Sequence, residues 1–351
     1  MLPGQRPWRE LHWLASMPET QVRAVGTPAP PDADDFVHRP YLQPTKRFVE
    51  AGSLAWLRGL RTLEPTGLWI ASLELCSLIS GQAARFARRH QRRHAVLVWA
   101  NDPATPLYWL PPYSLATRAS LDADLFLCFV HAAADHLEEL GVDLDRVRVV
   151  HPGVDLAVFR PPAKPPEEPT VVFASPLAEN KGIDRVLAAF RGVRSAVPDA
   201  RLVIAGGGPL EPLVRRAAQD DGGVSYVGRL ARDEVADLLR SATVFTTAPR
   251  ANLLWNEQFG LAYVEAMACG VPVVTTRCGS NHEAVAGPNV LVPQDTDALT
   301  EAIVGFLEDR DRRSHVSAWN VAHVQEEHDL VKQTRRMGQV FSEFEGGADA
   351  R

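Results

Sequence analysis

Cysteine is scarce in this sequence, and its distribution excludes several kinds of site. The 351 residues contain four cysteines, and no two of them have the C-x-x-C spacing of zinc or redox motifs. Residues 1–8 contain no apolar segment of the kind found in a secretory signal. We therefore expect a cytoplasmic protein with reduced thiols at all four positions, which are Cys76, Cys128, Cys269 and Cys278.

Long apolar runs and an excess of basic residues are also missing. No stretch reaches the roughly 18 consecutive apolar residues of a membrane-spanning helix, and the best runs, such as 125–130, have the length of a strand. The net charge is −6, whereas a general nucleic-acid binder is usually basic. With 46% apolar and 23% charged residues, the composition is typical of a globular protein and excludes a disordered chain.

Proline marks a division of the chain into two parts. At about 150 residues per domain, this length predicts two domains. Five of the ten residues from Arg160 to Pro169 are proline, which predicts a stiff linker. We therefore predict an N-terminal domain at 1–160, a linker at 161–169, a second domain at 170–317, and at 318–351 a C-terminal helix with a polar tail that could pack back on the first domain.

Short apolar segments alternate with amphipathic ones in the second part. Strands separated by single helices indicate βαβ units and a parallel, doubly wound sheet. The predicted strands are 170–174, 202–205, 224–227, 244–247 and 271–275, and the predicted helices are 183–196, 210–218, 233–240 and 261–269.

The first part repeats this pattern less cleanly. It opens on a predicted helix at 9–16, so the first strand of the domain is short or missing. The later predicted strands are 22–25, 95–99, 125–129 and 148–150, and the later helices are 75–89 and 132–140.

Two α/β domains joined by a linker place a cleft between them, and ligands of such sheets bind beyond the carboxyl ends of the strands.

The stretch from Trp255 to Pro272 carries the most informative pattern. Gly260 lies where a helix is predicted to begin, and glycine allows the backbone to approach a ligand closely. The free amides and the dipole of a helix start form an anion site. Glu257 and Glu265 flank that site, and carboxylates are acceptors that suit sugar hydroxyls. The spacing alone leaves a second interpretation open, in which both are ordinary surface or cap-side residues of a core helix.

The same stretch resembles the signature of retaining glycosyltransferase family 4. Five further motifs extend the resemblance, which runs from about residue 140 to 310. It implies the GT-B fold, an α/β architecture in which two Rossmann-like, doubly wound domains face each other across a cleft. The motifs are His151-Pro-Gly-Val-Asp155, Asn180-Lys-Gly-Ile-Asp184, Ala205-Gly-Gly-Gly-Pro209, Tyr226-Val-Gly-Arg-Leu230 and Gly279-Ser-Asn-His-Glu283.

This resemblance implies a role for each matching residue. Glu257 would contact the donor sugar as a catalytic residue, and Glu265 would bind the ribose hydroxyls. Lys181 would neutralise the leaving diphosphate, as an ammonium group does well, although a solvated loop lysine is the alternative interpretation. The remaining donor-binding residues would be Phe259, Gly260 and Leu261 at the sugar and diphosphate, and Gly207, Gly228 and Arg229 near the base.

One position departs from the family pattern. The family usually has an arginine five residues before the lysine, and this chain has Pro176 there. Losing one charge-assisted contact costs about 1.5–3 kcal/mol, so another arginine would have to compensate. The candidates are Arg229, Arg250 and Arg277, and the sequence does not place them.

The first domain is expected to bind the acceptor. Glu74 and Asn101 follow apolar segments and would face the cleft, although a helix cap and a strand-end turn are equally compatible interpretations. The basic run 85–94 could meet an anionic membrane or acceptor, or could be the solvated end of a helix. Two D-x-D matches, at 32–34 and 122–124, lie in a proline-rich loop and beside a strand, so we expect no metal site.

The predicted function is therefore a metal-independent, retaining transferase. It would need no cofactor and would move a sugar from a nucleotide-diphospho-sugar, with UDP favoured and GDP next, to the hydroxyl of a small-molecule, glycan or lipid-linked acceptor. No nucleic-acid partner or membrane span is expected, although peripheral contact with a membrane is compatible with the sequence. Two alternatives remain: a non-catalytic GT-B scaffold or partner subunit, and a GT-B epimerase or hydrolase of sugar nucleotides.

Overall fold

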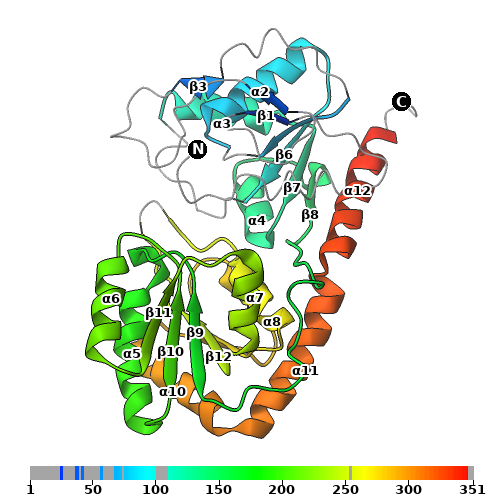
Figure 1. Cartoon of the computed structure of the whole chain (residues 1–351). Coiled ribbons are helices and arrows are strands. Elements are labelled where there is room, and N and C mark those ends of the chain that lie inside the picture. The colour runs from blue at the N-terminus through cyan, green and yellow to red at the C-terminus, as the bar shows by residue number, and fades with distance from the viewer. Residues whose placement is uncertain are drawn as a thin grey trace. The chain divides into compact units, whose positions relative to one another are not determined.

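The computed structural model describes most of the chain beyond residue 66 (Figure 1). The described residues are 67–72, 75–99, 110–252 and 255–346, together with four short strands nearer the N-terminus. These four are β1 (Ala24–Gly26), β2 (Phe36–His38), β3 (Tyr41–Leu42) and β4 (Trp56–Leu57). The predicted helix at 9–16 lies outside the described residues.

The chain forms two compact units. Unit 1 contains Met1–His151 and Val331–Arg351, and unit 2 contains Pro152–Leu330. The proline-rich segment at 161–169 thus lies inside unit 2, and the chain passes between the units at 151–152. Residues ahead of that segment already belong to unit 2, because Val154 N donates to His328 O at 2.7 Å and Phe159 is fully buried.

Unit 2 is built on a six-stranded parallel sheet. Its strands lie in the order β11-β10-β9-β12-β13-β14, so the chain starts in the middle and winds outward in both directions. This is the predicted doubly wound α/β arrangement, which is confirmed. The strands are β9 (Thr170–Ala174), β10 (Arg201–Ala205), β11 (Val224–Gly228), β12 (Val244–Thr247), β13 (Val273–Thr276) and β14 (Val290–Val292).

Helices cover both faces of this sheet (Figure 1). On one face α5 (Ile183–Ala196) packs against α10 (Thr296–Glu308), and their buried side chains join those of the strands in one core. On the other face α7 (Arg232–Arg240) packs against α8 (Leu261–Ala268), which also packs against α11 (Arg310–Glu327). The remaining helices are α6 (Glu211–Asp220) and α9 (Asn281–Ala284).

The predicted C-terminal helix is wrong in one respect, because it is two helices. Helix α11 ends at Glu327, and α12 (Leu330–Gly346) begins after a break at His328 and Asp329. The break arises because this segment pairs with Val154: His328 O accepts from Val154 N, and Leu330 N donates to Val154 O at 3.0 Å. A backbone committed to that bridge cannot also continue the helical ladder.

Unit 1 contains a smaller parallel sheet in the order β5-β6-β7-β8. Two strands, β6 and β7, are buried along their whole length, as expected for a sheet covered on both faces. No helix among the described residues is both long and apolar enough to cross a membrane. The elements are β5 (Trp69–Ser72), β6 (His94–Val98), β7 (Leu125–Cys128), β8 (Val147–Val149), α2 (Leu78–Arg89), α3 (Tyr113–Leu121) and α4 (His131–Glu139).

Candidate active site

The start of helix α8 forms the centre of the candidate site. Gly260 precedes the helix with φ +84°, a conformation that L side chains rarely adopt. A Cβ at this position would lie 2.2 Å from Cε2 of Tyr263, so the space also requires glycine. The first amides of a helix have no acceptor within the helix and carry its positive dipole end. The helix start expected between Phe259 and Leu261 is therefore present, and its binding of an anion stays a prediction.

Glu257 and Lys181 meet directly at this site. The Nζ atom of Lys181 lies 2.7 Å from Oε2 of Glu257, although the two residues are 76 positions apart in the sequence. Their side chains are 20% and 9% exposed, so the ion pair is largely shielded from water. The ammonium group also lies 4.6 Å from the ring centroid of Trp255, within range of a cation–π interaction. Lys181 is thus a positioned group and not a solvated loop lysine.

The loop after β9 positions Lys181. Lys181 ends a short 3-10 turn, and Gly182 follows in the left-handed conformation with φ +70°. The backbone passes so close to the segment after β12 that a Cβ on Gly182 would lie 1.8 Å from the carbonyl oxygen of Ala248. Arg250 N donates to Asn180 O at 3.1 Å. Because β9 and β12 are neighbours in the sheet, these contacts fix Lys181 at their carboxyl ends.

The loop after β13 positions Glu257. Ser280 N donates to Glu257 O at 2.9 Å, and Glu257 N donates to Oδ1 of Asn256 at 3.1 Å. Gly279 packs so closely that a Cβ there would lie 2.3 Å from Glu257 O. The motif at 279–283 therefore holds the backbone of the glutamate. His282 lies on the short helix α9 and is exposed.

Buried hydroxyl groups of the neighbouring strands form hydrogen bonds with the first turn of α8. The hydroxyl of Tyr263 lies 2.8 Å from Oγ1 of Thr247 and 3.3 Å from Oγ1 of Thr275. Burial, with a smaller contribution from the charge of Glu257, raises the pKa of Tyr263 above its ordinary value. The phenol therefore stays protonated and keeps its hydrogen bonds across the physiological pH range.

Glu265 and the glycine-rich loops are the remaining predicted donor-binding elements. Glu265 is on α8 and is buried. Gly206 N donates to Gly228 O at 2.7 Å, which joins the loops after β10 and β11. The side chain of Arg229 crosses Gly207, because a Cβ on this glycine would lie 2.4 Å from Nε of the arginine. Both loops thus follow the carboxyl ends of neighbouring strands, where the family resemblance places the nucleotide base.

The three arginines considered as replacements for the missing family arginine lie in different surroundings. Arg250 is paired with Asp184, with NH1 2.9 Å from Oδ2. Arg277 is exposed beyond β13. Arg229 lies against Gly207, and Gly207 O accepts from Leu177 N, the residue after Pro176, at 3.2 Å. Arg250 also contacts the loop that lacks the arginine, through its backbone, but its guanidinium is paired with Asp184, whereas the side chain of Arg229 lies against a glycine that is bonded to this loop.

Sequence reasoning missed several residues of the site. The sequence alone assigns no role to Trp255, Asn256, Tyr263 and Ser280, because their places in the site depend on contacts with other loops. A usable signal was that three of these four lie within the predicted glutamate stretch.

The acceptor side is less completely described. The candidates Glu74 and Asn101 lie outside the described residues. In unit 1, His131 follows β7 and His151 follows β8, and their ring centroids are 5.1 Å apart. Sequence reasoning missed this pair, although both histidines come just after predicted strands, where ligands of a parallel sheet bind.

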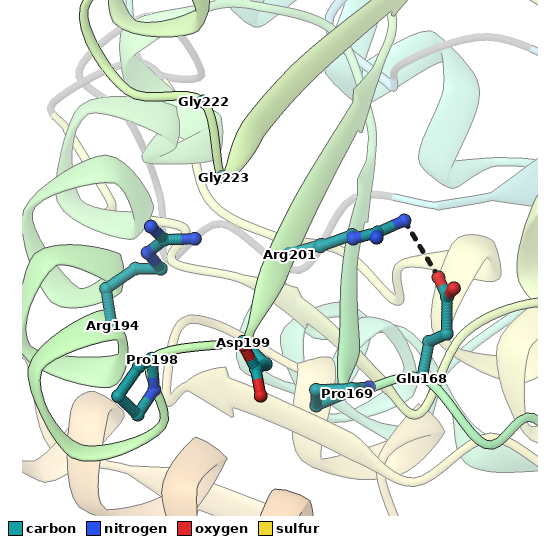
Figure 2. Close-up of a pocket in the computed structure, with 8 residues that line it drawn as sticks. All are labelled: Glu168, Pro169, Arg194, Pro198, Asp199, Arg201, Gly222 and Gly223. Atoms are coloured by element: carbon teal, nitrogen blue, oxygen red, sulfur yellow. Dashed lines mark hydrogen bonds and ion pairs between the residues drawn. The ribbon is translucent and has the colours of Figure 1, made fainter.

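A surface hollow in unit 2 lies at the opposite edge of the sheet (Figure 2). Its lining residues precede β9, β10 and β11, or lie at their amino ends, and include an ion pair of 2.9 Å between Arg201 and Glu168. Ligands of parallel sheets bind at the carboxyl ends of the strands. The hollow is therefore separate from the candidate site.

Comparisons with known proteins support the family resemblance. The model of the family Glycosyl transferases group 1 matches residues 168–309. The chain is 34% identical over 202 residues to a GDP-mannose-dependent monoacylated alpha-(1-6)-phosphatidylinositol monomannoside mannosyltransferase of Corynebacterium glutamicum, a match that covers 56% of this chain and 53% of that protein. It is 32% identical over 212 residues to a D-inositol 3-phosphate glycosyltransferase of Xylanimonas cellulosilytica, covering 53% and 49%. The chain thus spans about half the length of the curated relatives it matches.

Solved structures show a similar fold. The crystal structure of Anabaena HepE in complex with UDP matches with a TM-score of 0.67 at 18% identity, covering 81% of this chain and 80% of that one. Sucrose-phosphate synthase of Thermosynechococcus elongatus matches with a TM-score of 0.64 at 20% identity, covering 80% and 74%. At these identities the likeness concerns the fold alone, and it confirms the predicted GT-B class.

Proposed function

We propose that the chain is a glycosyltransferase of the group 1 type, which transfers a sugar from a nucleotide-diphospho-sugar to an acceptor hydroxyl; the match of residues 168–309 to the group 1 family model and the GT-B fold support this proposal. The observation that carries this proposal is the Lys181–Glu257 pair beside the start of helix α8. The cation and the free amides suit the negative charge of a diphosphate, and the carboxylate suits the hydroxyl groups of a sugar. A helix that serves only the packing of the core does not require a shielded ion pair beside its start.

In this proposal each part of the site binds one part of the donor. The ammonium of Lys181 and the first amides of α8 stabilise the negative charge that develops on the leaving diphosphate. Glu257 accepts hydrogen bonds from the sugar hydroxyls, and Glu265 accepts them from the ribose. Arg229 supplies the second cation, because its side chain lies against Gly207, whose carbonyl oxygen is bonded to the residue after Pro176, whereas the guanidinium of Arg250 is paired with Asp184. The protein's own cations thereby supply the charge stabilisation that a metal ion provides in other transferases.

We also propose that the anomeric configuration is retained, as in the family that the sequence resembles. The acceptor hydroxyl attacks from the side that the diphosphate leaves, and the departing phosphate oxygen takes the hydroxyl proton. The bond between the anomeric carbon and the phosphate oxygen breaks as the bond to the acceptor oxygen forms. In this route the protein stabilises charge and positions the two substrates, and no side chain has to act as a nucleophile.

The relatives narrow the choice of substrates. Four of them are named for GDP-mannose dependence and phosphatidylinositol mannoside acceptors, and others for inositol 3-phosphate. HepE is crystallised with UDP and glucose, so the fold also accommodates a uridine nucleotide. We therefore place GDP-mannose first among donors to test and a UDP-sugar second, with an inositol-based or lipid-linked acceptor.

A lipid-linked acceptor would require contact with a membrane surface. Helix α2 exposes Arg85 and Arg89, and Arg92 follows it, so the end of the helix presents cations that anionic lipids attract. Arg88 is engaged with Asp122 and contributes less free charge. Sedimentation with phosphatidylinositol vesicles tests this contact, and an arginine-to-glutamine variant at all three exposed positions should lose the binding.

Calorimetry tests the proposed function. GDP, GDP-mannose, UDP and UDP-glucose are titrated into the wild-type protein and into Lys181→Gln. Loss of one charge-assisted contact of about 1.5–3 kcal/mol should weaken nucleotide binding roughly 10- to 100-fold. The matched control is Arg201→Gln, which removes the cation of the remote ion pair in Figure 2 and should bind as wild type does. A wild-type protein that binds no nucleotide would favour the non-catalytic scaffold.

A further inference from the structure

The Lys181–Glu257 ion pair has a consequence for which ligands the site accepts. In the proposed function Lys181 binds the diphosphate and Glu257 binds the sugar, and the structure shows that the two groups also bind each other. As a pair they carry no net charge. A diphosphate anion that approaches Lys181 therefore also approaches a carboxylate that is only 9% exposed.

That carboxylate opposes the binding of a bare nucleoside diphosphate. Water screens a shielded pair of like charges poorly, so the phosphate and Glu257 repel each other. When the lysine turns toward the phosphate, the buried carboxylate also loses part of its own stabilisation. Trp255 makes it harder for Lys181 to turn toward a phosphate. The ammonium lies 4.6 Å from the centroid of the Trp255 ring, and this contact stabilises the lysine in the position where it binds Glu257.

An intact sugar nucleotide removes this obstacle. Its sugar hydroxyls donate hydrogen bonds to Glu257, and hydrogen bonds to a charged group are among the stronger ones. The sugar hydroxyls thus replace Lys181 as the hydrogen-bond donors to Glu257, and Lys181 becomes available to bind the diphosphate. A nucleoside diphosphate carries no sugar hydroxyls at this position, so it offers the carboxylate no donors in exchange for the ammonium.

We propose that the Lys181–Glu257 pair is a selectivity device, which makes the site prefer the intact nucleotide sugar over the nucleoside diphosphate that remains after transfer. The inference deepens the proposed function and rests on it. Its consequence for turnover is that departure of the sugar restores the ion pair and expels the nucleotide product.

Two variants with opposite expected effects test this device. The measured quantity is the ratio of the dissociation constants of GDP and GDP-mannose, determined by calorimetry, with UDP and UDP-glucose in parallel. Glu257→Gln removes the charge that repels the diphosphate and weakens the contact with the sugar, so the ratio should fall about tenfold. Lys181→Gln leaves the carboxylate without its cation, so the ratio should rise although both ligands bind more weakly.

The controls separate this inference from the proposed function. Glu168→Gln disrupts a pair of similar length, 2.9 Å, at the opposite edge of the sheet and should leave the ratio unchanged. If Glu257→Gln does not fold, as judged by circular dichroism, Lys181→Gln alone tests the selectivity device: a higher ratio of the dissociation constants supports it, and an unchanged ratio contradicts it. A wild-type protein that binds neither member of either ligand pair contradicts the proposed function. A wild-type protein that binds both, with the same ratio in the variants, contradicts only the selectivity device.

Discussion

Gly260 offers a sharp test of how the helix start is built. In Gly260→Ala the new methyl group must be accommodated at φ +84° and 2.2 Å from Cε2 of the buried Tyr263. The left-handed conformation costs a non-glycine residue about 1–2 kcal/mol. Displacing a buried ring adds about 1–3 kcal/mol, and the hydroxyl bonds of Tyr263 to Thr247 and Thr275 are then strained.

Gly141 provides the matched control. It also has φ +84°, but a Cβ there meets no atom within 4 Å, so Gly141→Ala should cost only the conformational term of about 1–2 kcal/mol. Urea denaturation should therefore show a loss of about 2–5 kcal/mol for Gly260→Ala, and calorimetry should show weakened GDP-mannose binding in that variant alone. Equal losses of stability in the two variants, or unchanged nucleotide binding in Gly260→Ala, would refute this account of the helix start.

Three further predictions follow from individual contacts. Tyr263→Phe keeps the ring and leaves Thr247 and Thr275 bonded to each other at 3.1 Å, so the free energy of unfolding should fall by only about 0.5–1.5 kcal/mol in urea denaturation. Asn256→Ala releases the backbone of Glu257, and the kcat/KM for donor turnover should fall about tenfold with little change in melting temperature. Burial lowers the pKa of His94 to about 4 from the usual 6.5, so between these pH values the unfolded chain binds a proton that the folded chain does not. Stability should therefore be lost as the pH falls from 6.5 to 4, by up to about 3 kcal/mol, and His94→Gln should flatten this slope in urea denaturation; an unchanged slope would contradict it.

Much of unit 2 could be predicted from the sequence because its signals are local. The strand at 170–174 and the helix at 183–196 coincide with β9 and α5, since a run of buried apolar residues or an amphipathic period is complete within each segment. Strand β14 and helix α10 escaped prediction. So did the break between α11 and α12, which depends on pairing with Val154, a residue far away in the sequence.

The candidate site also contains features that a local sequence pattern predicts and features that depend on contacts between distant segments. The pattern from Glu257 to Glu265 and the glycine before α8 are local, and they could be interpreted as an anion site beside carboxylates. The contact between Lys181 and Glu257 joins segments 76 residues apart, so only the family resemblance placed them at one site. The supporting bond from Ser280 to Glu257 comes from close packing of two loops, which no periodicity encodes.

The central claim is that Lys181 and Glu257 together act on a nucleotide sugar. The most direct measurement is donor turnover, followed as release of GDP from GDP-mannose in the presence of an inositol-based acceptor, in wild type, Glu257→Gln and Lys181→Ala. The account predicts that each variant loses at least about tenfold in kcat/KM, since each loses a charge-assisted contact with the transition state. Wild-type rates in both variants would contradict it.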